Sequence, residues 1–151
     1  MAETQTKPKL LLPFLQPFYD IVIPLSWPLI RIAVGGTMLA HGYHRLVGPP
    51  MSTAAEEFAK MGFEPALLAA YIVFINETIG AVCVMIGLFT RFFAASIAIE
   101  LAFISLLFVP NGWAWAHHGW EYVFLWGLLF FAIALRGGGP YSFDRKIGWE
   151  L

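Results

Sequence analysis

Three charged side chains lie inside long apolar segments of this sequence and are the first candidates for chemistry. Arg31 interrupts WPLIRIAVGGTML, Glu77 lies in AALLAAYIVFINETIGAVCVMIGLF, and Glu100 lies in FFAASIAIELAFISLLFV. A charge in hydrocarbon costs several kcal/mol unless it faces a partner, a cavity or water. We expect the three to meet inside a helical bundle, either as a structural ion pair between Arg31 and Glu77 or as a catalytic group whose additional carboxylate relays protons.

Small residues surround Glu77 on its predicted helical face. Ala70, Gly80 and Ala81 share that face at helical spacing, and small residues allow membrane helices to approach closely. We therefore expect this face to point into the bundle. Asn76, one position earlier, is expected to reach a second helix.

Histidines and a carboxylate form a second candidate group at the opposite end of the predicted bundle. His41 and His44 are one helical turn apart, and His117, His118 and Glu121 precede the last apolar segment. These types suit a quinone headgroup, which needs proton donors and acceptors. A haem held by His41 with His117 or His118 is an alternative, as are histidines that only bond loop carbonyls. A di-metal site is disfavoured because Glu77 lies deeper than His41, so no metal ligand is predicted.

The composition identifies the class of protein. Of the 151 residues, 59% are hydrophobic and 13% are charged, whereas soluble domains are about half apolar and a quarter charged. The net charge of −1 gives no basic surface for nucleic acid. Cys83 is the only cysteine, which excludes an internal disulfide or dithiol relay. The sequence predicts an integral membrane protein.

The elements that position these residues are four predicted membrane helices. Turn and breaker signals place them at about residues 26–44, 65–88, 92–109 and 119–136. Pro24 is expected to stop any earlier helix. A short helix is expected in the polar loop at 51–65. The predicted fold is an all-α integral membrane four-helix bundle.

The chain is expected to divide into three parts. Residues 1–25 form an N-terminal segment that lies at the interface or contacts a partner, residues 26–145 form the membrane domain, and residues 146–151 form a tail. More basic residues fall on the side of the two termini than on the side of the 51–65 loop. The positive-inside rule therefore predicts both termini in the cytoplasm and the short helix outside.

Six short motifs in order resemble one known family. They are RIAVG at 31–35, HGYHRLVG at 41–48, FAKMGF at 58–63, NETIG at 76–80, GLFTR at 87–91 and GGGPYSFD at 137–144. Together they are similar to the DoxX family of small four-helix bacterial membrane proteins, over about residues 28–145. The family motifs match at Arg31, His41, Glu77 and Asp144, and Glu121 stands at the usual acidic position that opens the last helix.

Two positions depart from the family pattern. Arg45 stands where a lysine is common, which should be harmless. Glu100 stands where the third helix is usually apolar or small, which suggests a local specialisation.

The resemblance implies a multi-pass protein of the bacterial inner membrane. It further implies a quinone-linked redox subunit, an oxidoreductase component that works with a protein partner or as a homo-oligomer. In that interpretation Glu77, Arg31 and Glu100 are catalytic, while His41, His117, His118 and Glu121 face the ligand. The alternative is a non-catalytic accessory subunit with a buried Arg–Glu latch. A third hypothesis is a proton path along Glu100, Glu77 and His41.

Overall fold

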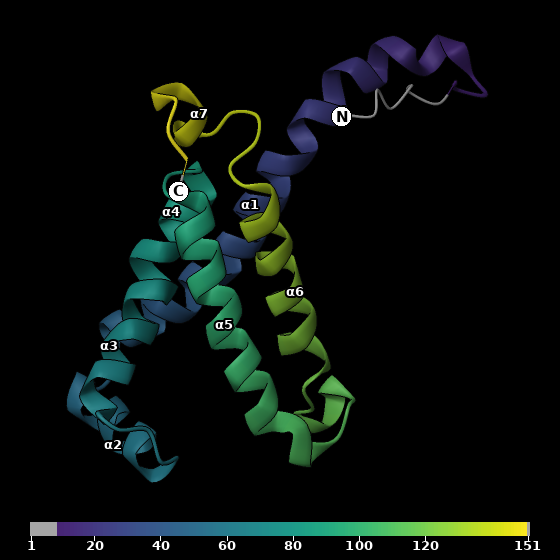
Figure 1. Ribbon diagram of the computed structural model, residues 1–151. Helices are drawn as coiled ribbons and strands as arrows, with labels where there is room; N and C mark the ends of the chain where they lie inside the picture. Colours follow the sequence, from purple (N-terminus) through teal and green to yellow (C-terminus); the bar gives the residue numbers. More distant parts are fainter. Residues whose placement is uncertain (1–8, 151) are drawn as a thin grey trace, which may run out of the picture.

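The structure is a computed structural model that describes residues 9–150 of the chain. All regular elements in this range are helices, as the apolar periodicity predicts. They form an elongated bundle in which α1 crosses the others obliquely (Figure 1). The part of the predicted N-terminal segment before residue 9, including Lys7, lies outside the described residues.

The first helix, α1 (Gln16–Val47), is longer than predicted and contains Pro24 and Pro28. The expectation that Pro24 stops an earlier helix is therefore wrong. A proline removes one backbone hydrogen bond but does not always end a membrane helix, because nearby hydroxyls can satisfy the freed carbonyl groups. The helix follows a short 3₁₀ turn, η1 (Pro13–Leu15).

The predicted helix at 65–88 is divided into three segments. These are α3 (Ala66–Ile75), a π-helical turn η2 (Asn76–Gly80) and α4 (Ala81–Ile86). π turns inside α-helices occur often at functional sites, and this one contains both Asn76 and Glu77. Gly87 then ends α4 in the left-handed region at φ 76°, which a glycine adopts without steric cost.

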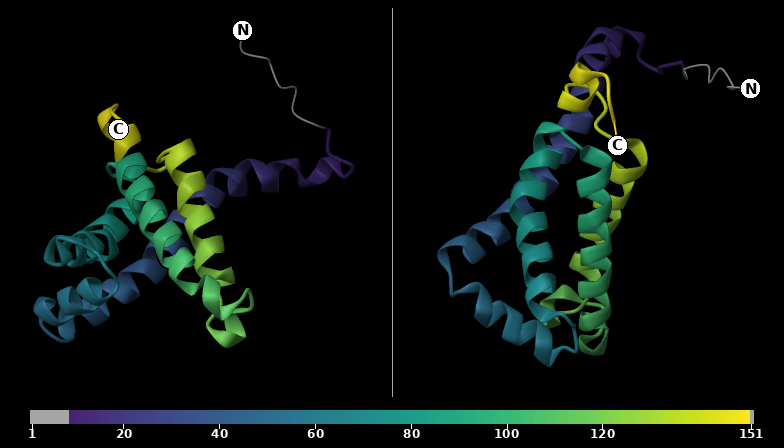
Figure 2. Two further views of the ribbon diagram at one scale, coloured as in Figure 1. Left: turned by 60° about the horizontal axis from the view of Figure 1, so that its bottom comes forward. Right: turned by 60° about the vertical axis from the view of Figure 1, so that its left-hand side comes forward.

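The second half of the chain forms a helical hairpin. Helix α5 (Thr90–Phe108) runs into a 3₁₀ turn, η3 (Val109–Asn111). A loop with a second turn, η4 (Trp115–His117), leads to α6 (Glu121–Arg136). The helices α5 and α6 lie side by side along their length (Figures 1 and 2), where Gly127 lets the two backbones come close. A helix break is present at each of the three predicted places: α1 ends at Val47, α4 at Ile86 and α5 at Phe108, against predicted ends at about residues 44, 88 and 109.

Two short helices complete the structure. The predicted loop helix is present as α2 (Met51–Lys60). Helix α7 (Phe143–Ile147) was not predicted, and it folds back beside the α4–α5 turn at the same end of the molecule as the start of α1 (Figure 1).

Within the described residues 9–150, three helical stretches are long and apolar enough to cross a membrane. They are Pro13–Val47, Ala66–Ile86 and Thr90–Asn111. Helix α6 has 16 residues, about 24 Å at 1.5 Å per residue, which is short of a full span without its flanking residues. The protein is therefore an all-helical membrane protein, while the fourth crossing and the side on which the termini lie stay predictions.

The buried core lies along the contact of α1, α4, α5 and α6. Its apolar members are Trp27, Val34, Met38, Ala81, Val84, Ala94, Ile97, Ala98, Leu101, Val123, Trp126, Phe130 and Ile133. Most other large apolar side chains are exposed, including many on the outer faces of the helices. An apolar outer surface is expected where lipid replaces water as the solvent.

Candidate functional site

Glycines on α1 set how this helix aligns with the α3–α4 segment. A Cβ atom at Gly42 would lie 2.6 Å from the carbonyl carbon of Glu77 and would overlap the carbonyl oxygen. At Gly35 a Cβ would lie 2.6 Å from the side chain of Met85. The two backbones are thus antiparallel and in direct contact, and Gly42 lies opposite Glu77.

This alignment gives Glu77 a different partner from the predicted one. Glu77 forms an ion pair with Arg45, from Arg45 Nε to Oε2 of the carboxylate. Arg31 lies eleven residues before Gly42, roughly 16 Å further along the helix. The expected ion pair between Arg31 and Glu77, and the meeting of Arg31 with both carboxylates, are therefore wrong. Glu77 is 5% exposed, and its predicted inward orientation is confirmed.

Asn76 connects the π turn to α5, as predicted. Its Nδ2 donates to Oε2 of Glu100 at 2.8 Å, and its Oδ1 accepts from Ser96 Oγ at 2.9 Å. The second carboxyl oxygen of Glu100, Oε1, is buried without a hydrogen-bond partner. Glu77 and Arg45 are the charged groups that act electrostatically on Glu100. Two buried carboxyl groups and one guanidinium therefore belong to a single polar cluster inside the bundle, which we call the Glu77 cluster.

A small pocket adjoins the Glu77 cluster. It encloses about 170 Å³ between the end of α1 and α2 and is lined by His44, Arg45, Pro49, Met51, Thr53, Ala54 and Glu57. The Arg45 side chain is 34% exposed whereas that of Glu77 is 6% exposed. Arg45 thus connects a buried carboxylate with an accessible pocket.

Arg31 belongs to a separate group at the other end of the molecule. It is 1% exposed, and its Nη2 donates to the carbonyl groups of Pro140 and Tyr141 at 3.5 and 3.3 Å. Its guanidinium lies directly against Gly87, where a Cβ atom would overlap Nη1. Arg31 Nε and Nη1 have no hydrogen-bond partner among the described residues. The buried charge is opposed by Asp144, the acidic group that acts on it electrostatically.

Asp144 caps the start of α5 from α7. Its Oδ1 accepts from the Phe89 backbone N–H at 2.8 Å, and its Oδ2 accepts from the backbone N–H and hydroxyl of Thr90 at 3.0 and 2.6 Å. A carboxylate at a helix N-terminus satisfies free N–H groups and complements the helix dipole. Sequence reasoning gave Asp144 no role. One feature of the sequence could have indicated this contact: GLFTR and SFD both belong to the motifs that carry the family resemblance. In the structure, Asp144 of SFD bonds to Phe89 and Thr90 of GLFTR.

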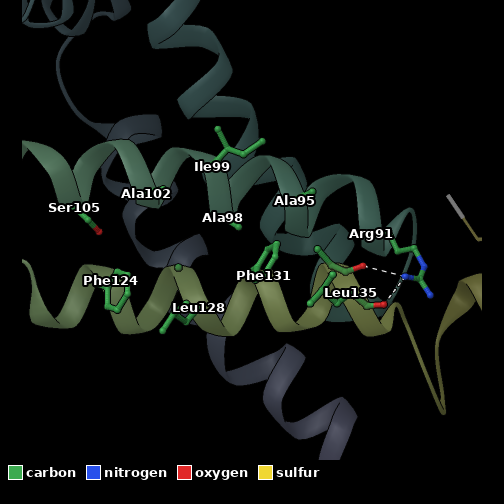
Figure 3. A pocket seen from close by; sticks show the side chains of 12 residues that line it. Arg91, Ala95, Ala98, Ile99, Ala102, Ser105, Phe124, Leu128, Phe131 and Leu135 are labelled. Atoms are coloured by element: carbon green, nitrogen blue, oxygen red, sulfur yellow. Dashed lines mark hydrogen bonds between the residues drawn. The ribbon is translucent and has the colours of Figure 1, made fainter.

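Arg91 completes this end of the molecule. Its Nη1 donates to the carbonyl groups of Ala134 and Leu135 at 3.1 and 2.6 Å (Figure 3). These are among the last carbonyl groups of α6, which have no partner inside the helix. The motif residues at 31, 87–91 and 137–144 therefore build one junction between α1, α4, α5, α6 and α7, which we call the terminal junction.

The predicted group of histidines is spread over the opposite end. His41 is exposed, and its ring lies 5.4 Å from that of Trp126. His117 and His118 are exposed in and after η4, and Glu121 accepts from the Trp115 backbone N–H at 3.2 Å. Within residues 9–150, no group of three or more His, Cys, Asp or Glu side chains is arranged to hold a metal ion. The cofactor role of these four residues stays a prediction.

A second, apolar pocket lies between α5 and α6. It encloses about 530 Å³ (Figure 3). Small residues from both helices form much of its wall, and its lining is Arg91, Ala95, Ala98, Ile99, Ala102, Ser105, Phe124, Gly127, Leu128, Phe131, Ala134 and Leu135. Such a surface suits an apolar chain or another helix rather than a polar substrate.

Comparison with known proteins places this arrangement in a family. The DoxX family model matches residues 26–110, from the inner part of α1 to the end of α5. The chain belongs to the DoxX family. The DoxX match includes the Glu77 cluster and the Arg31 and Gly87 part of the terminal junction.

One relative of this DoxX protein is an uncharacterized protein of Haemophilus influenzae. It is 28% identical over 132 residues, which is 82% of this chain and 91% of the relative. No solved structure matches the chain.

Proposed function

We propose that this DoxX protein is an inner-membrane subunit of a quinone-linked redox system and that it handles protons while a partner protein supplies the electrons. The observation that carries the proposal is the Glu77 cluster. Two carboxyl groups lie buried in apolar helices, and one of them contacts an arginine at the wall of a pocket. Ionisable groups inside a membrane domain mark proton or substrate paths by default.

The chemistry of quinones explains why such a subunit is needed. Reduction of a quinone to a quinol takes up two electrons and two protons, and the protons must come from positioned donors. The single cysteine of this chain cannot form an internal dithiol, so the electrons are assigned to a partner. The Glu77 cluster has two acidic side chains, one for each of the two protons that the quinone takes up.

The pocket beside Arg45 fits a quinone ring. Its volume of about 170 Å³ suits a single substituted ring, and Arg45, His44 and Thr53 offer donors for a carbonyl oxygen. When bound, the quinone supplies the redox chemistry. Arg45 orients the ring at the pocket wall, and Glu77, which is buried behind Arg45 as its ion-pair partner, is the carboxylate that takes up or releases a proton beside the site. Asn76 holds one oxygen of Glu100 and leaves the other free to accept or release a proton. His41, which was predicted to face the ligand, lies one helical turn before Arg45 on α1. The proposed quinone pocket is therefore near the end of α1 at which a ligand was predicted.

The test is quinone reduction by membranes that contain the protein and its natural partners. We expect Glu77→Gln and Glu100→Gln to lower the rate by roughly a hundredfold, the usual effect of losing a positioned acid or base. Glu56→Gln is the matched control, since Glu56 is exposed on α2 and does not line the pocket. Near-normal rates in both cluster variants, with folded protein present, would contradict the proposal.

A second candidate is a non-catalytic accessory subunit of a larger membrane complex. The apolar pocket between α5 and α6, walled by alanine and glycine, favours it, because small residues let another helix pack closely. In this case Arg45 and Glu77 form the buried latch. Loss of partner co-purification in Glu77→Gln, without any bound quinone in solvent extracts of the wild type, would favour this candidate.

A further inference from the structure

A third pocket lies at the end of the molecule that carries the terminal junction. It encloses about 540 Å³ between α1 and α7 and is lined by Pro24, Pro140, Tyr141, Ser142, Arg145 and Lys146. Figure 2 (right) shows α7 beside the first half of α1 at this end. The pocket is distinct from the Glu77 cluster, which lies further along α1 beside Gly42 and Arg45. Neither the proposed function nor the family match gives it a role.

The charge in this pocket is positive and uncompensated. Arg145 and Lys146 are exposed, and neither side chain forms an ion pair within residues 9–150. Asp144, between Ser142 and these two residues, turns inward to cap α5. Of the other acids at this end, Glu150 pairs with Arg91 at 3.3 Å, and Asp20, one helical turn before Pro24 on α1, accepts from Gln16 at 2.8 Å and does not line the pocket. Two cations therefore face a cavity without an acidic partner.

The positive charge continues behind the pocket wall. The buried Arg31 guanidinium donates to the carbonyl groups of Pro140 and Tyr141, and both of these residues line the pocket. Two of its nitrogens remain without partners among the described residues. An anion in the pocket would lower the electrostatic cost of burying this third cation, because charges interact strongly where water is scarce.

The surface beside the pocket is apolar. Ile21 and Leu25 flank Pro24 on α1 and are 69% and 49% exposed, and Phe143 and Ile147 on α7 are 48% and 54% exposed. The ammonium group of Lys146 lies 5.3 Å from the centre of the Phe143 ring. The pocket thus lies where a basic surface meets an apolar one, at the start of a helix long enough to cross the membrane.

We propose that this pocket binds the phosphate headgroup of an anionic phospholipid. Arg145 and Lys146 contact the phosphate, Tyr141 offers a hydroxyl, and the acyl chains lie along the apolar residues of α1. Basic pockets beside membrane helices are suited to such headgroups because charge and apolar contact act together. The proposal does not depend on the quinone-linked function. The lipid fixes α7 against α1 and so supports the terminal junction.

The test is lipid binding to the full-length protein in detergent, followed by native mass spectrometry. Phosphatidylglycerol and phosphatidylcholine are titrated separately into the wild type and the double variant Arg145→Gln/Lys146→Gln. We expect the wild type to prefer phosphatidylglycerol. The double variant should bind this lipid about thirtyfold more weakly, because each charge removed near a membrane surface weakens binding about fivefold. The control Lys60→Gln removes a charge from α2, outside the pocket, and should bind as the wild type does.

Two further arms of the experiment separate the possible explanations. Arg145→Lys/Lys146→Arg retains both charges and should bind normally, which separates charge from loss of fold. Inorganic phosphate is added as a competitor. If phosphate alone displaces the lipid completely at similar concentrations, the ligand is a free phosphate and the lipid proposal is overturned. It is also overturned if the double variant and the wild type bind phosphatidylglycerol equally.

Discussion

At the scale of single residues, the buried charged side chains of this protein form two groups with different contacts. Glu77, Glu100 and Arg45 lie in a cluster with one unsatisfied carboxyl oxygen and access to a pocket. Arg31 and Asp144 instead hold backbone groups, since one donates to carbonyl groups and the other accepts from N–H groups. Both oxygens of Asp144 are bonded, which suits a structural role, whereas Arg31 combines its bonds to carbonyl groups with two nitrogens that have no partner among the described residues.

The capping role of Asp144 gives a stability prediction. Asp144→Asn replaces a carboxylate that accepts from three donors by an amide with one accepting oxygen. We expect a loss of about 1–3 kcal/mol in the free energy of unfolding, because a buried donor of α5 is left without a partner. The measurement is unfolding in mild detergent followed by circular dichroism. Asp20→Asn, which changes an exposed carboxylate bonded only to Gln16, should leave stability nearly unchanged.

At the scale of elements, the contact of α1 with η2 and α4 decides what the cluster contains. Backbone contact at Gly42 brings Arg45 to Glu77 and leaves Arg31 beside Gly87. A different alignment of the same two helices would separate Arg45 from Glu77 and Arg31 from Gly87. The π turn then directs Asn76 toward α5 while Glu77 faces α1. The cluster is thus a product of helix alignment as well as of residue type.

Two glycines of α1 provide a matched test of this contact. An alanine at Gly42 would overlap the Glu77 carbonyl group, whereas a Cβ at Gly36 meets no atom within 4 Å. We expect Gly42→Ala to destabilise the protein by about 1–3 kcal/mol, the usual cost of overpacking, and to separate Arg45 from Glu77. Gly36→Ala should cause no loss, since alanine is the better helix former. Equal thermal stability of the two variants in detergent would argue against the close contact.

At the scale of the whole molecule, the two ends differ in charge and in architecture. Within the described residues, the end with the terminal junction carries Lys9, Arg91, Arg136, Arg145 and Lys146, and the other end carries Arg45 and Lys60. Basic residues near helix ends favour the cytoplasmic side. We therefore predict that the terminal junction and the pocket between α1 and α7 face the cytoplasm, and that the pocket beside Arg45 faces the other side of the membrane.

Reporter fusions test this assignment and the fourth crossing together. Green fluorescent protein fused after residue 150 should fluoresce if the C-terminus lies in the cytoplasm. The same reporter does not become fluorescent when the general secretion route carries it unfolded across the membrane. Alkaline phosphatase inserted in the loop after α2 should be active, because it requires an oxidising compartment to form its disulfides. Fluorescence from a fusion truncated at residue 118, before α6, would show that α5 ends in the cytoplasm and would contradict the expected orientation.

The sequence by itself determined the class, the breaks between helices and the inward face of Glu77. These depend on local signals. Apolar length, Gly48-Pro49-Pro50 and Gly87 act on the backbone where they stand, and small residues at helical spacing mark a packed face. Pro24 shows the limit of such signals, because α1 continues through it although a proline removes a backbone hydrogen bond.

Only the tertiary structure decided which charge meets which. Arg31 lies within the predicted helix 26–44 and Arg45 directly follows its predicted end, and either could reach a carboxylate by residue type alone. The backbone contact between Gly42 and Glu77 fixes the alignment, so Glu77 meets Arg45 while Arg31 and Asp144 join the ends of distant segments. Helix alignment is a property of two surfaces packed together, and a one-turn shift of about 5.4 Å changes every partner.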